Sequence, residues 1–370
     1  MNALWVRETP MGPAAVTERW RRGDDTAFDV ALRVGKPLDV QALKGGTSLD
    51  ETRAYAADLR EAAARLYGRP GEAFAACPCC AAPAADATDG PEVFGVVYRR
   101  CARCAHLFVG NQPAPQALDA RYEEDTEISS IYTDPATQEV RLREVVAPKV
   151  QWTREVFAAA HGRAPRSLLD VGAGGGHVVA GARRAGLAAE GLELSRSSRR
   201  FAREALGVEL SGADFLADPP PGGAPDVITM FGLLEYTPQP ARFLARAQEL
   251  LGDDGLLVVE VPRADSVSTA VQEPAGSVVA RHADPTTHVN LFSDASLAEL
   301  LWQSGFAPVA VWYFGMDAYE LAVQLALEAD ERSLDALTGA LSTLQGALDR
   351  ARLCDDVIVA AVPARSYHRP

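Results

Sequence analysis

Short apolar runs and longer amphipathic segments alternate over the second half of the chain. The apolar runs predict strands at 167–171, 188–194, 226–230, 255–261 and 355–362, with a further short strand near residue 208. The segments between them predict helices at 177–184, 197–206, 240–251 and 294–304, and a long loop at 262–290. Strands that alternate with helices form a parallel sheet covered on both faces, so we expect an α/β fold with a doubly wound sheet.

The rest of the chain is expected to divide into smaller parts. Residues 1–70 carry polar and helical patterns, and the clearest helix begins after Ser48 and ends at Gly68. We expect a helical N-terminal segment at 1–70, a cysteine-rich domain at 71–112, a helical connector on the substrate side at 113–165, and the α/β domain at 166–370. A helical insertion is predicted at about 325–353, before the last strand.

Five of the six cysteines are concentrated in one short stretch. Four of them form the pattern C-x2-C-x20-C-x2-C, namely Cys77, Cys80, Cys101 and Cys104. Two such turns, joined through a hairpin at 92–98, can close a tetrahedral zinc site, and four thiolates leave no position open for catalysis. The sequence therefore predicts a structural Zn²⁺ ion, with buried free thiols or disulfides as the alternatives. Cys79 is a spare thiol, His106 a substitute ligand, and Cys354 an ordinary small residue.

Composition and charge narrow the class of protein. The 370 residues include 36 Lys+Arg and 50 Asp+Glu, which gives a formal net charge of −14. The negative electrostatic field of this charge repels the phosphate backbone of nucleic acids, so we expect no nucleic acid partner. The first residues lack the apolar centre of a signal peptide, and no later run is long enough to span a membrane. We therefore expect a cytoplasmic protein.

A glycine-rich loop follows the first strand of the α/β part. Asp170 ends that strand, Gly172–Gly176 follows, and Glu193 ends the second strand. Such a turn exposes backbone amides to a ligand, and an acid in the position of Glu193 can hold ribose hydroxyls. A dinucleotide fingerprint would need a glycine or alanine at His177, so a nicotinamide cofactor does not fit. Asp170 beside the loop suits a cationic amine.

Residues 168–176, Leu-Leu-Asp-Val-Gly-Ala-Gly-Gly-Gly, resemble the first motif of the class I S-adenosylmethionine-dependent methyltransferases. Residues 230–236 and 250–262 are similar to later motifs of that family, in the same order, and the likeness covers about 166–314. It implies a Rossmann-like fold with Glu193 on the ribose and Asp214 near the adenine amino group, although either acid could be a solvated strand end. The implied cofactor-binding residues are Asp170, Gly172, Ala173, Gly174, Glu193, Leu194, Asp214, Phe215 and Phe231.

The order of cysteine turns, tyrosine-bearing segment and cofactor core resembles a narrower group. This group comprises bacterial methyltransferases with an N-terminal zinc-binding domain, including C-methyltransferases that act on nucleotide-linked keto-deoxysugars in antibiotic pathways. Residues 104–108, Tyr122, Tyr132 and 282–293 carry the likeness. Sugar-methylating relatives have a Glu-His pair where this chain has Thr287 and His288, so removal of a proton from a sugar carbon does not carry over directly.

Methyl transfer requires alignment of the nucleophile with the methyl donor and, for many acceptors, a base. A neutral histidine suits this task near pH 7, which makes His288 the first candidate. The alternative is that His288 packs against the following helix. The other candidates for catalysis are Tyr236, Glu235, Tyr132 and His282, although Tyr122 and Tyr132 can equally be packing residues.

Three functions follow from these motifs. The leading one is an S-adenosylmethionine-dependent methyltransferase that acts on a small-molecule acceptor, either a sugar nucleotide or a specialised metabolite, and that carries structural zinc. An RNA base methyltransferase with a zinc unit is the second, and the acidic charge disfavours it. A non-catalytic protein with a cofactor fold is the third, and the intact Asp170 and Glu193 disfavour it. A homodimer is left open.

Overall fold

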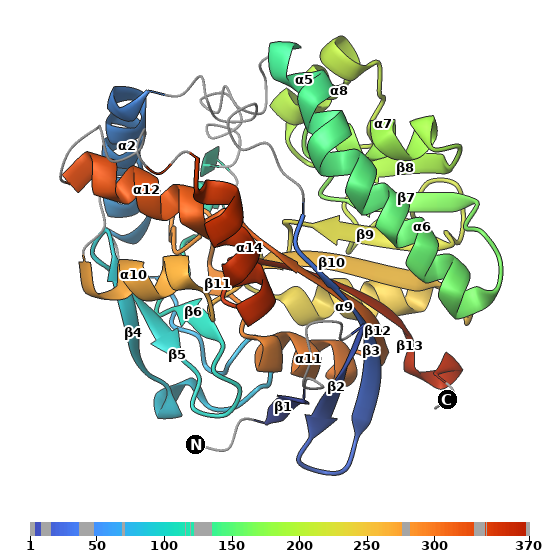
Figure 1. Cartoon of the computed structure of the whole chain (residues 1–370), viewed down its shortest axis with the longest axis horizontal. Coiled ribbons are helices and arrows are strands. Elements are labelled where there is room, and N and C mark those ends of the chain that lie inside the picture. Colours follow the sequence, from blue (N-terminus) through green and yellow to red (C-terminus); the bar gives the residue numbers. More distant parts are fainter. Residues whose placement is uncertain are drawn as a thin grey trace.

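The computed structural model describes most of the chain (Figure 1). The described residues are 4–8, 16–36, 48–68, 71–114, 116–118, 120–121, 135–275, 282–328, 337 and 339–367. Two of the tyrosines considered above, Tyr122 and Tyr132, lie outside them. No helix within the described ranges has the length and apolar character needed to cross a membrane.

A central mixed sheet organises the fold. Within the described residues it has nine strands in the order β1-β2-β3-β12-β13-β10-β9-β7-β8. Four strands predicted from apolar runs pair in parallel, and they are β7 (Ser167–Val171), β8 (Ala188–Leu192), β9 (Val227–Phe231) and β10 (Leu256–Pro262). The last predicted strand is β13 (Asp356–Pro363), which runs antiparallel between β10 and β12 (Phe306–Phe314).

Helices cover both faces of this sheet, as Figure 1 shows, so the predicted doubly wound α/β class is confirmed. The predicted helices are α7 (His177–Arg184), α8 (Arg196–Leu206), α9 (Pro240–Leu250) and α11 (Asp294–Gln303). Local capping explains where two of them begin. Ser195 and Ser293 each accept a hydrogen bond from the backbone N–H three residues later, which satisfies an amide that the helix leaves unpaired.

Two expectations about this part of the chain are wrong. Residues 208–210 do not form a strand, because only an isolated bridge joins Ser211 to Leu192, and β8 is therefore the last strand on its side. The segment expected as one long loop contains helix α10 (Val267–Ala275). Between β12 and β13 lie α12 (Asp317–Glu328) and α14 (Leu341–Ala351), so the helical insertion begins earlier than predicted.

The N-terminal part is not wholly helical, contrary to the prediction. Three strands, β1 (Trp5–Glu8), β2 (Thr17–Arg22) and β3 (Ala27–Val34), precede the predicted helix α2 (Leu49–Tyr67). Residues in β2 alternate between exposed and buried, so the period is that of a strand, and charged residues hide it. β3 pairs in parallel with β12 and extends the central sheet.

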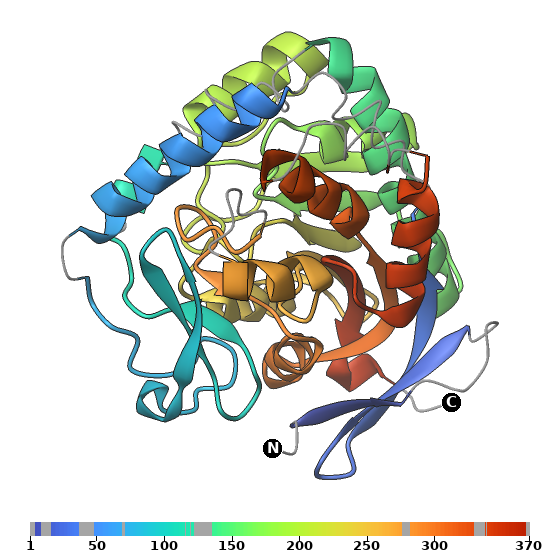
Figure 2. The same cartoon turned by 60° about the vertical axis from the view of Figure 1, so that its left-hand side comes forward.

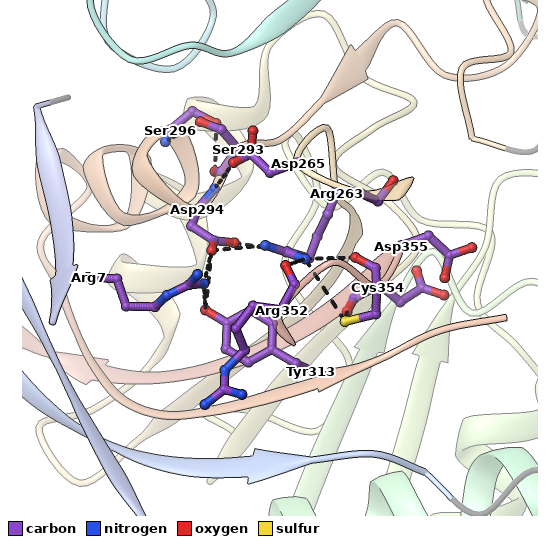
Figure 3. Close-up of polar contacts among 12 residues, drawn as sticks. Arg7, Arg263, Asp265, Ser293, Asp294, Ser296, Tyr313, Arg352, Cys354 and Asp355 are labelled. Carbon is purple, nitrogen blue, oxygen red and sulfur yellow. Dashed lines mark hydrogen bonds and ion pairs between the residues drawn. The ribbon is translucent and has the colours of Figure 1, made fainter. Parts of the chain in front are cut away.

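Buried charges fix β1 to the α/β part (Figure 3). Arg263, just after β10, is almost fully buried and donates to both carboxylate oxygens of Asp294, over 2.9 and 3.0 Å. Arg7 on β1 donates to the same carboxylate and, over 3.2 Å, to the hydroxyl of Tyr313. Asp294 at the start of α11 therefore joins two strands that are far apart in sequence.

The cysteine-rich residues form a small second sheet. Its described strands run in the order β11-β6-β5-β4, and β4 (Thr88–Val93) and β5 (Val96–Arg100) make the expected hairpin. The strand β6 (Leu107–Val109) pairs with β11 (Asn290–Leu291), which comes from the α/β part. We call residues 71–114 the cysteine module. The two parts therefore share one sheet, while the predicted domain boundaries stay predictions.

The helix α2 belongs with the cysteine module rather than with β1–β3. Ala63 and Tyr67 on α2 pack in one hydrophobic cluster with module residues such as Tyr98. Figure 2 shows α2 on the opposite side of the molecule from the N-terminal strands.

Candidate functional site

Two predicted site residues, Asp170 and Phe231, lie at one edge of the central sheet. The strands β7, β9 and β10 are parallel, so their carboxyl ends lie side by side, together with the beginning of the antiparallel β13. In a doubly wound sheet this edge is where ligands bind. The edge therefore brings together Asp170 from β7, Phe231 from β9, Glu260 from β10 and Asp356 from β13.

In the loop after β7, only glycine fits at position 172. Gly172 has a φ of +72°, and a Cβ there would lie 2.8 Å from the Cδ1 atom of Leu233. Gly174 has a φ of +51°, and a Cβ built there would meet no atom within 4 Å. The first glycine allows a close approach of two loops, while the second borders open space in which a ligand can lie.

Glu193, just after β8, is tied to this glycine loop. Its Oε2 atom accepts a hydrogen bond of 2.7 Å from the N–H of Gly174, and its Oε1 atom accepts one of 2.8 Å from the N–H of Ser195. Each carboxylate oxygen has two acceptor positions, so the same oxygens can also accept from a pair of hydroxyls. These contacts fix the carboxylate of Glu193 beside the glycine loop.

Asp170 lies buried directly below the loop. The hydroxyl of Thr229 donates to its Oδ1 atom over 2.6 Å. Burial raises the pKa of Asp170 to about 7, and the negative charge of Glu193 acts in the same direction. A cation bound nearby would favour the ionised carboxylate. This acid therefore suits a positively charged ligand group.

The remaining predicted cofactor contacts lie in mixed surroundings. Leu194 is 63% exposed at the end of β8, and Ala173 is buried in the loop. Asp214 is exposed, and its Oδ1 atom accepts from the N–H of Leu216 over 2.9 Å. Phe215 is buried and stacks on Phe243 at 6.0 Å, so its ring lies in the core. The structure thus joins Glu193 directly to the glycine loop, whereas Asp214 and Phe215 make the contacts with Leu216 and Phe243 described above.

A pair of lysines was missed by the sequence reasoning. Lys149 is buried and forms an ion pair with Glu260, and its Nζ atom lies 5.4 Å from the ring centre of Phe231. The Nζ atom of Lys36 lies 4.9 Å from the ring centre of Phe314, and burial followed by the charge of Lys149 lowers its pKa to about 7. Lysine is rare in this chain, and that rarity was the signal that could have pointed to them.

His288, His282 and Tyr236 form a group of rings in contact with one another. The ring centres of Tyr236 and His288 are 5.0 Å apart in an edge-on contact, and those of His282 and His288 are 6.0 Å apart and nearly parallel. The Nδ1 atom of His288 lies 2.8 Å from the carbonyl oxygen of His282. A carbonyl only accepts, so Nδ1 carries the hydrogen and Nε2 is the basic nitrogen of the neutral ring.

The cysteine module supports this histidine loop. The hydroxyl of Tyr98 donates to the carbonyl of His288 over 2.7 Å. His106 bonds through Nε2 to Asn290, and the amide of Asn290 donates to the carbonyls of Leu234 and Thr237, on either side of Tyr236. The other nitrogen of His106 lies 3.3 Å from the hydroxyl of Ser296. His106 is therefore a support for the loop, and the idea that it replaces a cysteine ligand is wrong.

Glu235 is the acid among the predicted catalytic residues, and it is buried. Burial raises its pKa well above the ordinary value, and the charges of Asp356 and Glu260 add to this effect. Its Oε2 atom has no hydrogen-bond partner among the described residues. The backbone carbonyl of Glu235 accepts from the N–H groups of Val289 and Asn290, so its chain position is fixed beside the histidine loop.

Four buried cysteines gather where their spacing predicts. The Sγ atoms of Cys77, Cys80, Cys101 and Cys104 all lie within 4.8 Å of one another. The closest pairs are 3.7 and 3.5 Å apart, near the separation of about 3.8 Å that two sulfurs have when each is about 2.3 Å from a tetrahedral zinc ion. A disulfide needs about 2.05 Å, and all six cysteines are free thiols.

The two cysteine turns repeat the same backbone geometry. In each, the fourth residue after the first cysteine has a positive φ, 55° at Ala81 and 59° at Ala105. The N–H of each alanine donates to the carbonyl of that cysteine over 3.0 Å. Cys79 is buried but lies outside the four-sulfur group. Two matched turns that present four sulfurs to one point could hold a metal ion.

Comparison with known proteins decides the family of the central part. Residues 143–311 match the family model described as a methyltransferase domain. Residues 143–311 are a methyltransferase domain. This match confirms the methyltransferase class predicted for this part of the chain.

Relatives of this methyltransferase domain are distant. A ubiquinone biosynthesis O-methyltransferase from Ralstonia nicotianae is 29% identical over 140 residues, which are 36% of this chain and 57% of that protein. A protein of the same name from Thiobacillus denitrificans is 24% identical over 55% of this chain and 89% of its own length. Among solved structures, the 1,6-didemethyltoxoflavin-N1-methyltransferase of Burkholderia thailandensis is 19% identical, with a TM-score of 0.42 over 72% of this chain and 95% of that one.

Proposed function

We propose that the whole chain transfers a methyl group from S-adenosylmethionine to a small-molecule acceptor. The observation that carries this proposal is the bond between Glu193 and the N–H of Gly174 at the carboxyl edge of the sheet. It joins an acid able to hold a ribose with a loop open to a ligand. In this proposal the carboxylate of Glu193 accepts from the ribose hydroxyls, and Asp170 faces the cationic end of the cofactor.

On the acceptor side, His288 is proposed as the base. The acceptor atom would attack the methyl carbon in line with the C–S bond, S-adenosylhomocysteine would leave as a neutral thioether, and Nε2 of His288 would take the proton of the acceptor atom. The hydrogen bond from Nδ1 to the carbonyl of His282 supports this role, because it leaves Nε2 as the nitrogen that takes the proton. Tyr236 packs on the imidazole, and buried Glu235 holds the backbone of the same loop. We propose a sugar nucleotide or a specialised metabolite as the acceptor.

A structural zinc ion is proposed for the four cysteines. Four thiolates fill the coordination shell of Zn²⁺, so the ion would stabilise the two turns and take no part in the reaction. The residues of the module that touch the histidine loop, Tyr98 and His106, would then be held in place.

Glu193→Ala should abolish the stabilisation of the protein by S-adenosylmethionine or S-adenosylhomocysteine. At 100 times its Kd a ligand adds about 2.7 kcal/mol to stability, so thermal unfolding with and without ligand measures the effect. Glu209→Ala is the matched control, because that side chain is exposed and pairs only weakly with Arg203 at 3.9 Å. An equal thermal shift in the Glu193→Ala variant would show that the ribose assignment is wrong.

His288→Gln should reduce turnover by roughly 10²–10⁴-fold, the usual contribution of a general base, while the cofactor still stabilises the protein. The control is His161→Gln, since His161 ends α6 (Ala147–His161) near Asp226 and Asp254, at the opposite edge of the sheet. Turnover is measured against a panel of hydroxylated and keto acceptors. Wild-type turnover in the His288→Gln variant would remove this residue as the base.

A further inference from the structure

The N-terminal strands carry Lys36 to the carboxyl edge of the central sheet. β3 pairs in parallel with β12, and β12 runs in the same direction as β10 because both are antiparallel to β13. Lys36 comes just after the end of β3. The N–H of Gly35 donates to the carbonyl of Tyr313 over 2.8 Å, and the indole of Trp312 donates to the carbonyl of Gly35 over 2.8 Å. These bonds fix the backbone immediately before Lys36.

The ammonium group of Lys36 has no hydrogen bond or ion pair with any residue that the structure describes. Its contact is with the ring of Phe314, whose centre lies 4.9 Å from the Nζ atom. The Nζ atom of Lys149 lies 5.9 Å from the same ring centre, but Lys149 is paired with Glu260. Lys36 is only half-buried, so a ligand can reach its three N–H donors.

The acids near Lys36 do not take up these donors. Glu260 pairs with Lys149, and Asp356 acts on Lys36 only through its charge. Burial lowers the pKa of Lys36 to about 7, and the charges of Lys149 and, to a smaller extent, Arg141 act in the same direction. Glu260 and Asp356 oppose this shift without cancelling it. A negatively charged group at the Nζ atom would favour the ammonium form.

Lys36 lies next to the residues proposed for the cofactor but comes from a different part of the chain. The Nζ atom of Lys149 lies 5.4 Å from the ring centre of Phe231, so Lys149 stands between Phe231 and the ring of Phe314. Lys36 and Phe314 both lie outside the methyltransferase domain at 143–311. Enzymes that share a cofactor fold differ in the residues that select the acceptor, and an added segment can supply such a residue.

We propose that Lys36 holds a negatively charged oxygen group of the acceptor, either a carboxylate or a phosphate. An ammonium is a compact charge with three donors, which can bind either group, and a hydrogen bond between two charged groups is about twice as strong as a neutral one. The inference names the acceptor class of the proposed methyl transfer. It rests on that function only for the identity of the molecule that is bound.

The test follows the lysine side chains of the full chain by nuclear magnetic resonance. The sequence contains only Lys36, Lys44 and Lys149, so protein labelled with ¹³C at the lysine ε-carbon gives one signal for each, and Lys36→Arg identifies the signal of Lys36. The probes are acetate and inorganic phosphate, added at constant ionic strength and without cofactor. With at least one of them, the signal of Lys36 should shift to saturation. Its pKa should rise by at least about 1 above the value of about 7, because the anion favours the charged form.

Either probe can support the proposal, and the one that binds identifies the group. A response to acetate indicates a carboxylate on the acceptor, and a response to phosphate indicates a phosphate. Arg19→Met is the matched control, since it removes an exposed cation from the same N-terminal strands and should leave the response of Lys36 unchanged. The proposal is overturned if neither probe shifts the Lys36 signal, or if Arg19→Met abolishes the response.

Stabilisation by S-adenosylhomocysteine, measured on the wild type and on both variants, shows that they are folded. It also tests the cofactor assignment separately, because the anion titration is done without cofactor. A response of Lys36 to an anion in a protein that S-adenosylhomocysteine does not stabilise would keep the anion site and contradict the proposed methyl transfer.

Discussion

Replacing Cys101 by serine should remove the zinc ion that we propose for the four cysteines and unfold the cysteine module. The free energy with which four thiolates bind Zn²⁺ in zinc-finger peptides is about 10–16 kcal/mol, and in such small modules it is also folding free energy. Three sulfurs and a hydroxyl cannot replace that site. We expect a loss of about one zinc per chain in elemental analysis, together with a lower unfolding temperature.

Cys79→Ser is the matched control for this prediction. Cys79 lies in the other cysteine turn and is also buried, but its sulfur is outside the four-sulfur group. The Cys79→Ser variant should keep the zinc, and its free energy of unfolding should fall only by the small amount that burying a hydroxyl costs. Equal zinc content in the Cys101→Ser variant would contradict the proposed ligand set.

The Cys101→Ser substitution should also lower turnover, because the cysteine module supports the loop that carries His288. Tyr98 bonds to the carbonyl of His288, and His106 bonds to Asn290, whose amide donates to the carbonyls on either side of Tyr236. The residues that we propose for cofactor binding, Glu193 and Gly174, lie elsewhere along the edge. Turnover is therefore expected to fall more than cofactor-dependent stabilisation.

Arg263→Ala should lower the free energy of unfolding by about 3–5 kcal/mol, which is the usual cost of removing one partner of a buried ion pair. The variant leaves Asp294 with fewer donors and removes the hydrogen bonds that Arg263 gives to the carbonyls of Arg352 and Cys354. Chemical denaturation at neutral pH measures the loss. The exposed pair between Arg19 and Asp29 provides the control, because Arg19→Ala should cost less than about 1 kcal/mol.

The contribution of this ion pair depends on pH in a defined direction. Burial alone would raise the pKa of Asp294, but the guanidinium groups of Arg263 and Arg7 outweigh it and hold the pKa below the usual range. The stabilisation is therefore present above about pH 4, the ordinary value for an aspartate, and is lost as the pH falls below it. A similar difference between wild type and Arg263→Ala at pH 7 and pH 2 would contradict this account.

The α/β core could be predicted because its strands are buried on both faces. Residues 256–259 and 357–362 read as continuous apolar runs, which are typical of a sheet covered on both faces. In β1–β3 only one face is buried, and Trp20 stands between arginines. Helix α10 was missed because its serine, threonine and proline residues resemble a loop.

Only those site residues that belong to one local sequence motif could be predicted. The glycine loop and Glu193 lie within a few residues of two strand ends, so their contact follows from the order of elements. The group of Lys36 with Lys149 and Phe314 joins segments that are distant in sequence and share no motif. It depends on β3 pairing in parallel with β12, which sequence periodicity does not reveal.

The pairing of β3 with β12 constrains the order in which parts of the protein can fold during translation. Ala31 pairs with Ala310 and Val34 with Tyr313, so the first strands synthesised must wait for a partner near the end of the chain. During translation β2 and β3 can form a hairpin, with β1 on its outer strand, whose β3 edge is exposed. We expect a nascent chain that stops before residue 306 to leave this hairpin sensitive to protease, and release of the full chain to protect it.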